Sequence, residues 1–134
     1  MKVLYPILTM LIFLCNIPMA FSETQAQSYE RQIKSTLLSM PTDDLVWIRA
    51  FNNTYSLSCK SHKTYNDFNR FSQIATKVIV DQMFDRTDWG VKMDFKYGFR
   101  KKQLQGLKKQ LGTNGFCSCI HNHIMKGNSA CLNP

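Results

Sequence analysis

Three cysteines and two histidines lie within residues 115–131, in the sequence GFCSCIHNHIMKGNSAC. Thiolate sulfur and imidazole nitrogen are the ligands that zinc prefers, and paired thiols can also carry redox chemistry or form structural disulfides. The pairs Cys117/His121 and Cys119/His123 each have the i, i+4 spacing that lets two side chains of one helix hold an ion. On a straight helix these two pairs point in nearly opposite directions, so they do not form one four-ligand site.

The cellular compartment decides between these uses, and residues 1–22, MKVLYPILTMLIFLCNIPMAFS, indicate export. A lysine, a long apolar run and small residues at its end, Ala20 and Ser22, follow the order of a cleaved secretory signal peptide. We expect cleavage after Ser22 and a mature chain of residues 23–134, periplasmic or secreted, without a transmembrane segment. An uncleaved membrane anchor is the alternative interpretation.

Cleavage would remove one of the five cysteines and leave four, which are Cys59, Cys117, Cys119 and Cys131. An even number of cysteines in a short exported chain predicts two disulfides. A bridge between Cys117 and Cys119 would close a very small strained ring. If residues 116–126 are helical, Cys117 points inward and Cys119 lies at the margin of the buried face. We therefore predict the pairs 59–117 and 119–131, with metal binding by the Cys/His cluster as a weaker alternative.

Charge is distributed unevenly along the mature chain. The nine acidic residues all precede residue 95, where they are balanced by basic residues. The segment 95–134 has no acidic residue and seven basic ones, which are Lys96, Arg100, Lys101, Lys102, Lys108, Lys109 and Lys126. A basic segment of this kind attracts an anionic partner, or serves only as a solvated helix face. We assign partner binding to Arg100, Lys101, Lys102, Lys108 and Lys109.

Apolar residues at helical spacing predict helices over 28–40, 64–86, 100–111 and 116–126. Thr42, Asp43 and Asp44 have the composition of a helix start, which favours a helix over 45–59 as well. The strand-forming residues of 45–59, with a turn at Asn52 and Asn53, allow a hairpin as the alternative. Thr64 is the expected cap of the helix over 64–86, which we predict to be central in the core.

Residues 89–99, WGVKMDFKYGF, alternate between apolar and polar side chains without a break. This period of two is typical of a half-buried strand, and two glycines weaken a helix. We predict an extended segment here. The predicted fold is therefore a mainly α-helical, small single-domain bundle of residues 23–134, stapled by two disulfides. A small α+β fold with a short antiparallel sheet is the alternative.

The sequence contains no nucleophile elbow, zinc-protease motif or phosphate-binding glycine loop, so we predict a protein that is not an enzyme and has no cofactor. In outline, a signal peptide, a short helical chain and a C-x-C near the C-terminus, it resembles small periplasmic accessory proteins of bacteria. This outline implies a binding protein such as an inhibitor, immunity protein or secretion/assembly factor. Its partner would be an acidic protein surface or an anionic envelope component, and not nucleic acid. A cationic effector of membranes or envelope polymers is the alternative.

Overall fold

The computed structural model describes residues 23–132, so the predicted signal peptide lies outside the described residues. This part of the chain forms α2 (Gln25–Ser39), α3 (Thr42–Ser58), α4 (Tyr65–Asp85), α5 (Val91–Lys126) and the 3₁₀ turn η3 (Ala130–Leu132). No strand occurs between residues 23 and 132. The predicted helical, disulfide-stapled bundle is therefore confirmed, and the α+β alternative is wrong.

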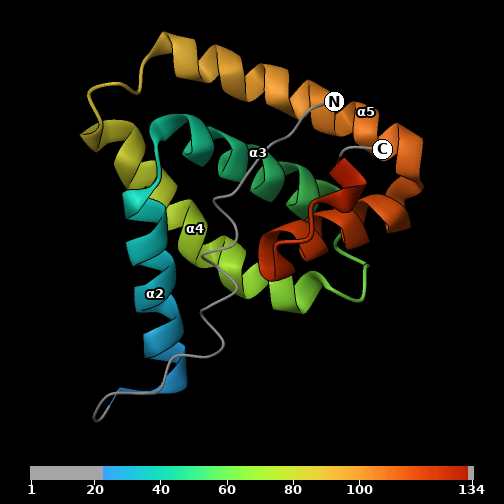
Figure 1. Ribbon diagram of the computed structural model, residues 1–134, viewed down its shortest axis with the longest axis horizontal. Helices are drawn as coiled ribbons and strands as arrows, with labels where there is room; N and C mark the ends of the chain where they lie inside the picture. The colour runs from blue at the N-terminus through green and yellow to red at the C-terminus, as the bar shows by residue number, and fades with distance from the viewer. Residues whose placement is uncertain (1–22, 133–134) are drawn as a thin grey trace.

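The central helix of the bundle is α3. It contacts both α4 and α5, while α2 packs on α4 (Figure 1). Val46, Trp47, Ile48 and Phe51 are all buried, so α3 is covered on nearly every side. The prediction of a helix over 45–59 is thus correct, and the hairpin alternative is wrong. The strand-forming residues of this segment are buried in the core of the bundle. The expectation that 64–86 would be central is wrong, because α4 leaves its outer side in solvent.

The N-termini of α3 and α4 are not capped by the threonine side chains that lie there. Pro41 occupies the cap position of α3, and Thr42 uses its hydroxyl to donate a hydrogen bond to Asp88 at 2.8 Å. Thr64 precedes α4, but its side chain makes no capping bond. Its hydroxyl bonds instead to His62 and Tyr55, which ties the α3–α4 loop to α3.

The prediction of an extended segment over 89–99 is wrong, because α5 begins at Val91 and residues 91–99 are helical. On a helix, residues four apart share a face. The alternating apolar residues therefore separate into two sets on opposite faces, one with Met93 and Tyr97 and the other with Phe95 and Phe99. Tyr97 of the first set is partly buried against the core and lies under Arg49 of α3, whereas Phe95 and Phe99 are exposed.

α5 consists of two helical segments, 91–111 and 113–126, that meet at Gly112. The backbone of Gly112 has φ 72° and ψ 167°, a conformation that is essentially restricted to glycine. The chain turns at this residue, and the second segment returns below the first (Figure 1). The predicted end of a helix at Gly112 is confirmed. Cys117, Ile120 and Ile124 of the second segment are fully buried, as expected for its inward face.

Candidate functional site

The outward face of 91–111 is the most exposed apolar surface of the described chain. Val91, Phe95 and Phe99 follow one another at intervals of four residues and are 72%, 76% and 64% exposed. Lys102, three residues after Phe99, and Lys109, seven residues after Lys102, continue the same face. We call this surface, residues 91, 95, 98, 99, 102, 106 and 109, the α5 outer face. Its N-terminal half is apolar and aromatic, and its C-terminal half is basic.

A shallow groove of about 490 Å³ lies in the apolar half of the α5 outer face. It is lined by Val91, Asp94, Phe95, Gly98, Phe99 and Lys102. A Cβ atom placed on Gly98 would meet nothing within 4 Å, so no side chain of the described residues fills this space. The groove therefore offers apolar walls with a carboxylate at one end and an ammonium group at the other.

Two of the basic residues of the C-terminal third are engaged with α3. Lys96 Nζ lies 2.9 Å from Asp43 Oδ1, and Arg100 Nη2 lies 3.0 and 3.1 Å from the two Asp43 oxygens. The Arg100 guanidinium also lies 4.1 Å above the Trp47 ring. Partial burial alone would raise the pKa of Asp43, but the hydrogen bonds and charges of these two cations outweigh it and lower the pKa. These contacts hold α5 across α3.

The other basic residues assigned to partner binding differ in their surroundings. Lys101 Nζ lies 5.1 Å from the centre of the Tyr97 ring, and Lys108 donates a 3.1 Å hydrogen bond to Ser58. Lys102 and Lys109 are exposed and form no ion pair or hydrogen bond with the residues that the structure describes. The charges most available to a partner are therefore Lys102 and Lys109, both on the α5 outer face.

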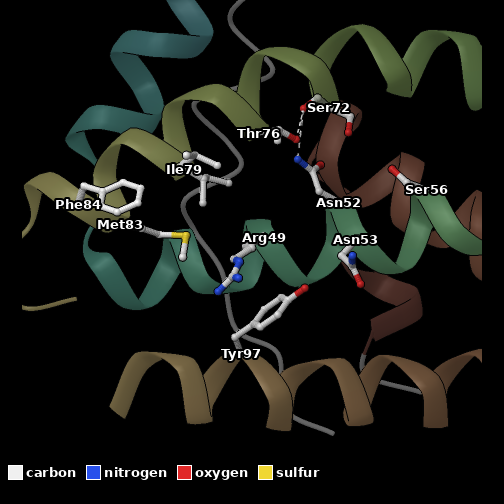
Figure 2. A pocket seen from close by; sticks show the side chains of 11 residues that line it. Arg49, Asn52, Asn53, Ser56, Ser72, Thr76, Ile79, Met83, Phe84 and Tyr97 are labelled. Atoms are coloured by element: carbon white, nitrogen blue, oxygen red, sulfur yellow. Dashed lines mark hydrogen bonds between the residues drawn. The ribbon is translucent and has the colours of Figure 1, made fainter. Parts of the chain in front are cut away.

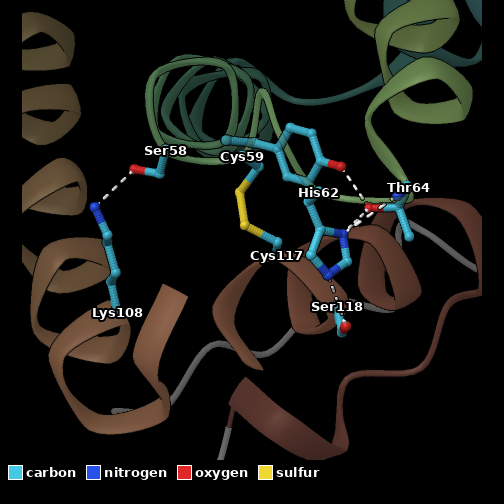
Figure 3. The surroundings of a disulfide bond; sticks show 8 residues. Ser58, Cys59, His62, Thr64, Lys108, Cys117 and Ser118 are labelled. Carbon is cyan, nitrogen blue, oxygen red and sulfur yellow. Dashed lines mark hydrogen bonds between the residues drawn. A yellow bond between two sulfur atoms is a disulfide. The ribbon is translucent and has the colours of Figure 1, made fainter. Parts of the chain in front are cut away.

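Both predicted disulfides are present, Cys59–Cys117 and Cys119–Cys131. The first joins the end of α3 to the returning segment of α5, next to His62 and the loop before α4 (Figure 3). The second ties η3 to the same segment. All four cysteines among the described residues are therefore joined in disulfides.

The histidines are each held by an oxygen-bearing neighbour. His121 Nε2 lies 2.7 Å from Asp67 Oδ2, and the buried His123 bonds to Ser129 at 2.9 Å. Burial lowers the pKa of His123 to about 4, so its ring is neutral at neutral pH. Within residues 23–132 no three His, Cys, Asp or Glu side chains come together as metal ligands would.

His62 and Ser118 are the pair that most resembles a catalytic arrangement, with Nε2 and Oγ 3.3 Å apart (Figure 3). The Nδ1 atom of His62 accepts a hydrogen bond from the backbone N–H of Thr64, so the ring proton lies on Nε2. Nε2 then donates to Ser118 and cannot take its proton. Ser118 lies inside a helix, where backbone N–H groups are bonded along the helix and cannot stabilise an oxyanion. The pair is structural.

Sequence reasoning missed the α5 outer face, because the alternation over 89–99 indicated a strand. The same sequence contains the signal, since Val91, Phe95 and Phe99 stand at i, i+4 and i+8. The alternative of a hairpin turn at Asn52 and Asn53 is also wrong, because Asn52 is buried within α3.

Comparison with protein-family models, curated proteins and solved structures gives no match to this chain. Among the described residues, no helix is both long and apolar enough to cross a bilayer. The function must therefore be argued from the chemistry of the surface itself.

Proposed function

We propose that the protein is an exported, non-enzymatic binding protein whose partner is another protein with an acidic and partly apolar surface. The observation that carries this proposal is the α5 outer face, where Phe95 and Phe99 are exposed beside Lys102. Exposed aromatic side chains that cluster on one helix face mark interaction sites more often than isolated ones do. An inhibitor, an immunity protein or an assembly factor would use such a surface.

The charge of the α5 outer face favours an anionic partner. Lys102 and Lys109 form no ion pair with the residues that the structure describes, whereas Lys96 and Arg100 are already paired with Asp43. Two unpaired lysines next to an apolar groove suit a partner that presents carboxylates around an apolar anchor residue. Such charges increase the rate of encounter and make the binding sensitive to salt.

The groove favours a protein partner over an anionic membrane. It is concave at Gly98, so it accepts a protruding side chain from another molecule. Asp94 lines it and is 61% exposed. A carboxylate at this place would be repelled by anionic headgroups and is costly to insert among acyl chains. It can, however, accept hydrogen bonds from a polypeptide.

The two disulfides support the exported part of the proposal. Disulfides form and persist in oxidising compartments and are rare in the cytosol. A chain that joins all four cysteines of residues 23–134 in pairs fits the periplasm or the exterior of the cell.

The proposal is tested by photo-crosslinking in the cells that make the protein. A photoreactive phenylalanine analogue replaces Phe95 in one version and the exposed Leu57 of α3 in the matched control. We expect one discrete protein adduct from position 95 and none from position 57, with the adduct containing an acidic protein. Adducts of equal yield at both positions, or none at position 95, would contradict the proposal.

Charge reversal then measures the role of the lysines. Binding of the purified partner by Lys102→Glu/Lys109→Glu should fall about ten-fold or more, because attraction becomes repulsion. The control, Lys63→Glu/Lys77→Glu, has the same change of charge at residues outside the α5 outer face and should bind as the wild type does. Leakage of anionic vesicles by the wild type, lost in Phe95→Ser, would instead support the cationic effector.

A further inference from the structure

A cavity of about 510 Å³ opens between α3, α4 and α5, with Tyr97 as its lining residue from α5 (Figure 2). Arg49, Asn52, Asn53 and Ser56 line it from α3. These positions have the spacing i, i+3, i+4 and i+7, so they form one polar stripe along α3, next to the buried apolar residues of the same helix. The volume lies in the range of small-molecule sites in proteins.

Three buried polar atoms in this cavity have no hydrogen-bond partner among the described residues: Arg49 Nη1, Asn52 Oδ1 and Asn53 Oδ1. Asn52 is only 6% exposed, and its amide nitrogen makes a single long bond of 3.5 Å to the Ser72 carbonyl. Buried polar groups are nearly always hydrogen-bonded, so the two amide oxygens without a partner, beside an Arg49 Nη1 atom that has only an ion pair with Asp94, point to a ligand.

The guanidinium of Arg49 is held in place inside the cavity. Its Cζ atom lies 3.8 Å from the centre of the Tyr97 ring, and its Nη1 atom lies 3.6 Å from Asp94 Oδ1. The second distance is too long for a hydrogen bond. Arg49 therefore keeps donors available, and a planar guanidinium binds a carboxylate with two parallel bonds.

The two ends of the cavity differ in chemistry, and Arg49 lies between them (Figure 2). Asn52 and Asn53 occupy one end with amide groups that can both donate and accept hydrogen bonds. Ile79, Met83 and Phe84 of α4 line the other end. Phe84 is 85% exposed, so it leaves apolar surface open at the rim.

From this arrangement we infer that the cavity binds an N-acylated apolar amino acid, the chemistry that is also found at the C-terminus of a peptide. The carboxylate would bind Arg49, the apolar side chain would lie against Met83 and Phe84, and the amide would bond to Asn52 and Asn53. This site is separate from the α5 outer face and requires no protein partner.

The inference is tested by titrating the oxidised, ¹⁵N-labelled protein with N-acetyl-leucine and with N-acetyl-leucinamide. We expect saturable shifts of the Asn52 and Asn53 side-chain amides, with the acid binding about ten-fold more tightly than the amide. Acetyl-Ala-Ala-Leu separates the two sources of this chemistry, since tighter binding of the tripeptide indicates a peptide C-terminus and equal binding indicates a free acyl amino acid.

Two variants and one control complete the experiment. Arg49→Gln should remove the preference for the acid, and Asn53→Asp should abolish binding of the acid while leaving the Arg49–Tyr97 contact in place. Lys101→Gln, which changes the contact with Tyr97 from outside the cavity, should bind as the wild type does. Absence of saturable binding of either probe, or equal affinity of the folded wild type for acid and amide, would overturn the inference.

Discussion

Asp43, in the first turn of α3, receives hydrogen bonds on both carboxylate oxygens from Arg100 of α5, at 3.0 and 3.1 Å. Fifty-seven residues separate the two along the chain, and the contact fixes where 91–111 crosses the central helix. The basic C-terminal third thus has two roles. Arg100 and Lys96 hold the fold together, and Lys102 and Lys109 face outward.

Replacing Asp43 with asparagine should lower the free energy of unfolding by about 1 kcal/mol at pH 7, a modest loss because the carboxylate is 41% exposed. The folded-state pKa of Asp43 is lowered, so its stabilisation is present above the unfolded pKa of roughly 4 and disappears as the pH falls through the folded pKa. Urea unfolding at pH 7 and at about pH 2 should therefore show a difference between wild type and variant only at the higher pH. Asp81→Asn, at an exposed position on α4, is the matched control and should show no difference at either pH.

Much of the fold could be predicted because the apolar residues of 28–40, 64–86 and 100–111 repeat at helical spacing. Their inward residues, Leu37, Phe68 and Leu104 among them, are fully buried in the structure. The disulfide pairs also followed from helix geometry, since Cys117 points inward toward Cys59 and Cys119 can reach Cys131 after the turn. These features depend on local spacing, which the sequence contains.

The segment 89–99 could not be assigned in the same way, because its period of two arises from two apolar faces on one helix. One face, with Met93 and Tyr97, is turned toward α3, and the other, with Phe95 and Phe99, lies in solvent. A sequence pattern does not distinguish a face that is covered within the chain from one that is open. The cavity at Arg49 and Asn52 was unpredictable for a related reason, since it depends on how far apart α3, α4 and α5 pack.

The exposure of Phe95 and Phe99 on the α5 outer face can be tested by substitution. Phe95→Ser/Phe99→Ser should leave the free energy of unfolding within about 0.5 kcal/mol of the wild type, because both rings are already exposed. Leu104→Ala, on the opposite face of the same helix, should cost about 2–5 kcal/mol through the cavity that it leaves. Chemical denaturation of the three proteins measures this contrast, and a large loss in the double serine variant would show that the aromatic rings are buried.

The two disulfides should differ in their contribution to the free energy of unfolding. Cys59→Ala/Cys117→Ala releases a loop with a sequence separation of 58, and in the chain-entropy model this costs about 4 kcal/mol. Cys119→Ala/Cys131→Ala releases a separation of only 12, which corresponds to about 3 kcal/mol. Thermal unfolding of each variant should give the lower midpoint for the first pair. The reverse order would show that the Cys119–Cys131 disulfide stabilises the fold by more than loop closure.

The buried His123 should make the free energy of unfolding decrease in mild acid. This decrease should occur at higher pH than the decrease caused by protonation of Asp43. Burial lowers the folded-state pKa of His123 to about 4, whereas an unfolded histidine titrates near 6.5. Between these two values the unfolded chain binds a proton that the folded protein excludes, so stability is complete above about pH 6.5 and decreases as the pH falls toward 4. Linkage gives a loss of up to about 3 kcal/mol. His123→Gln, which does not titrate, should lack most of this loss in urea unfolding at pH 4.5 and pH 7. An NMR titration in which the His123 ring of the folded protein protonates near pH 6.5 would contradict the prediction.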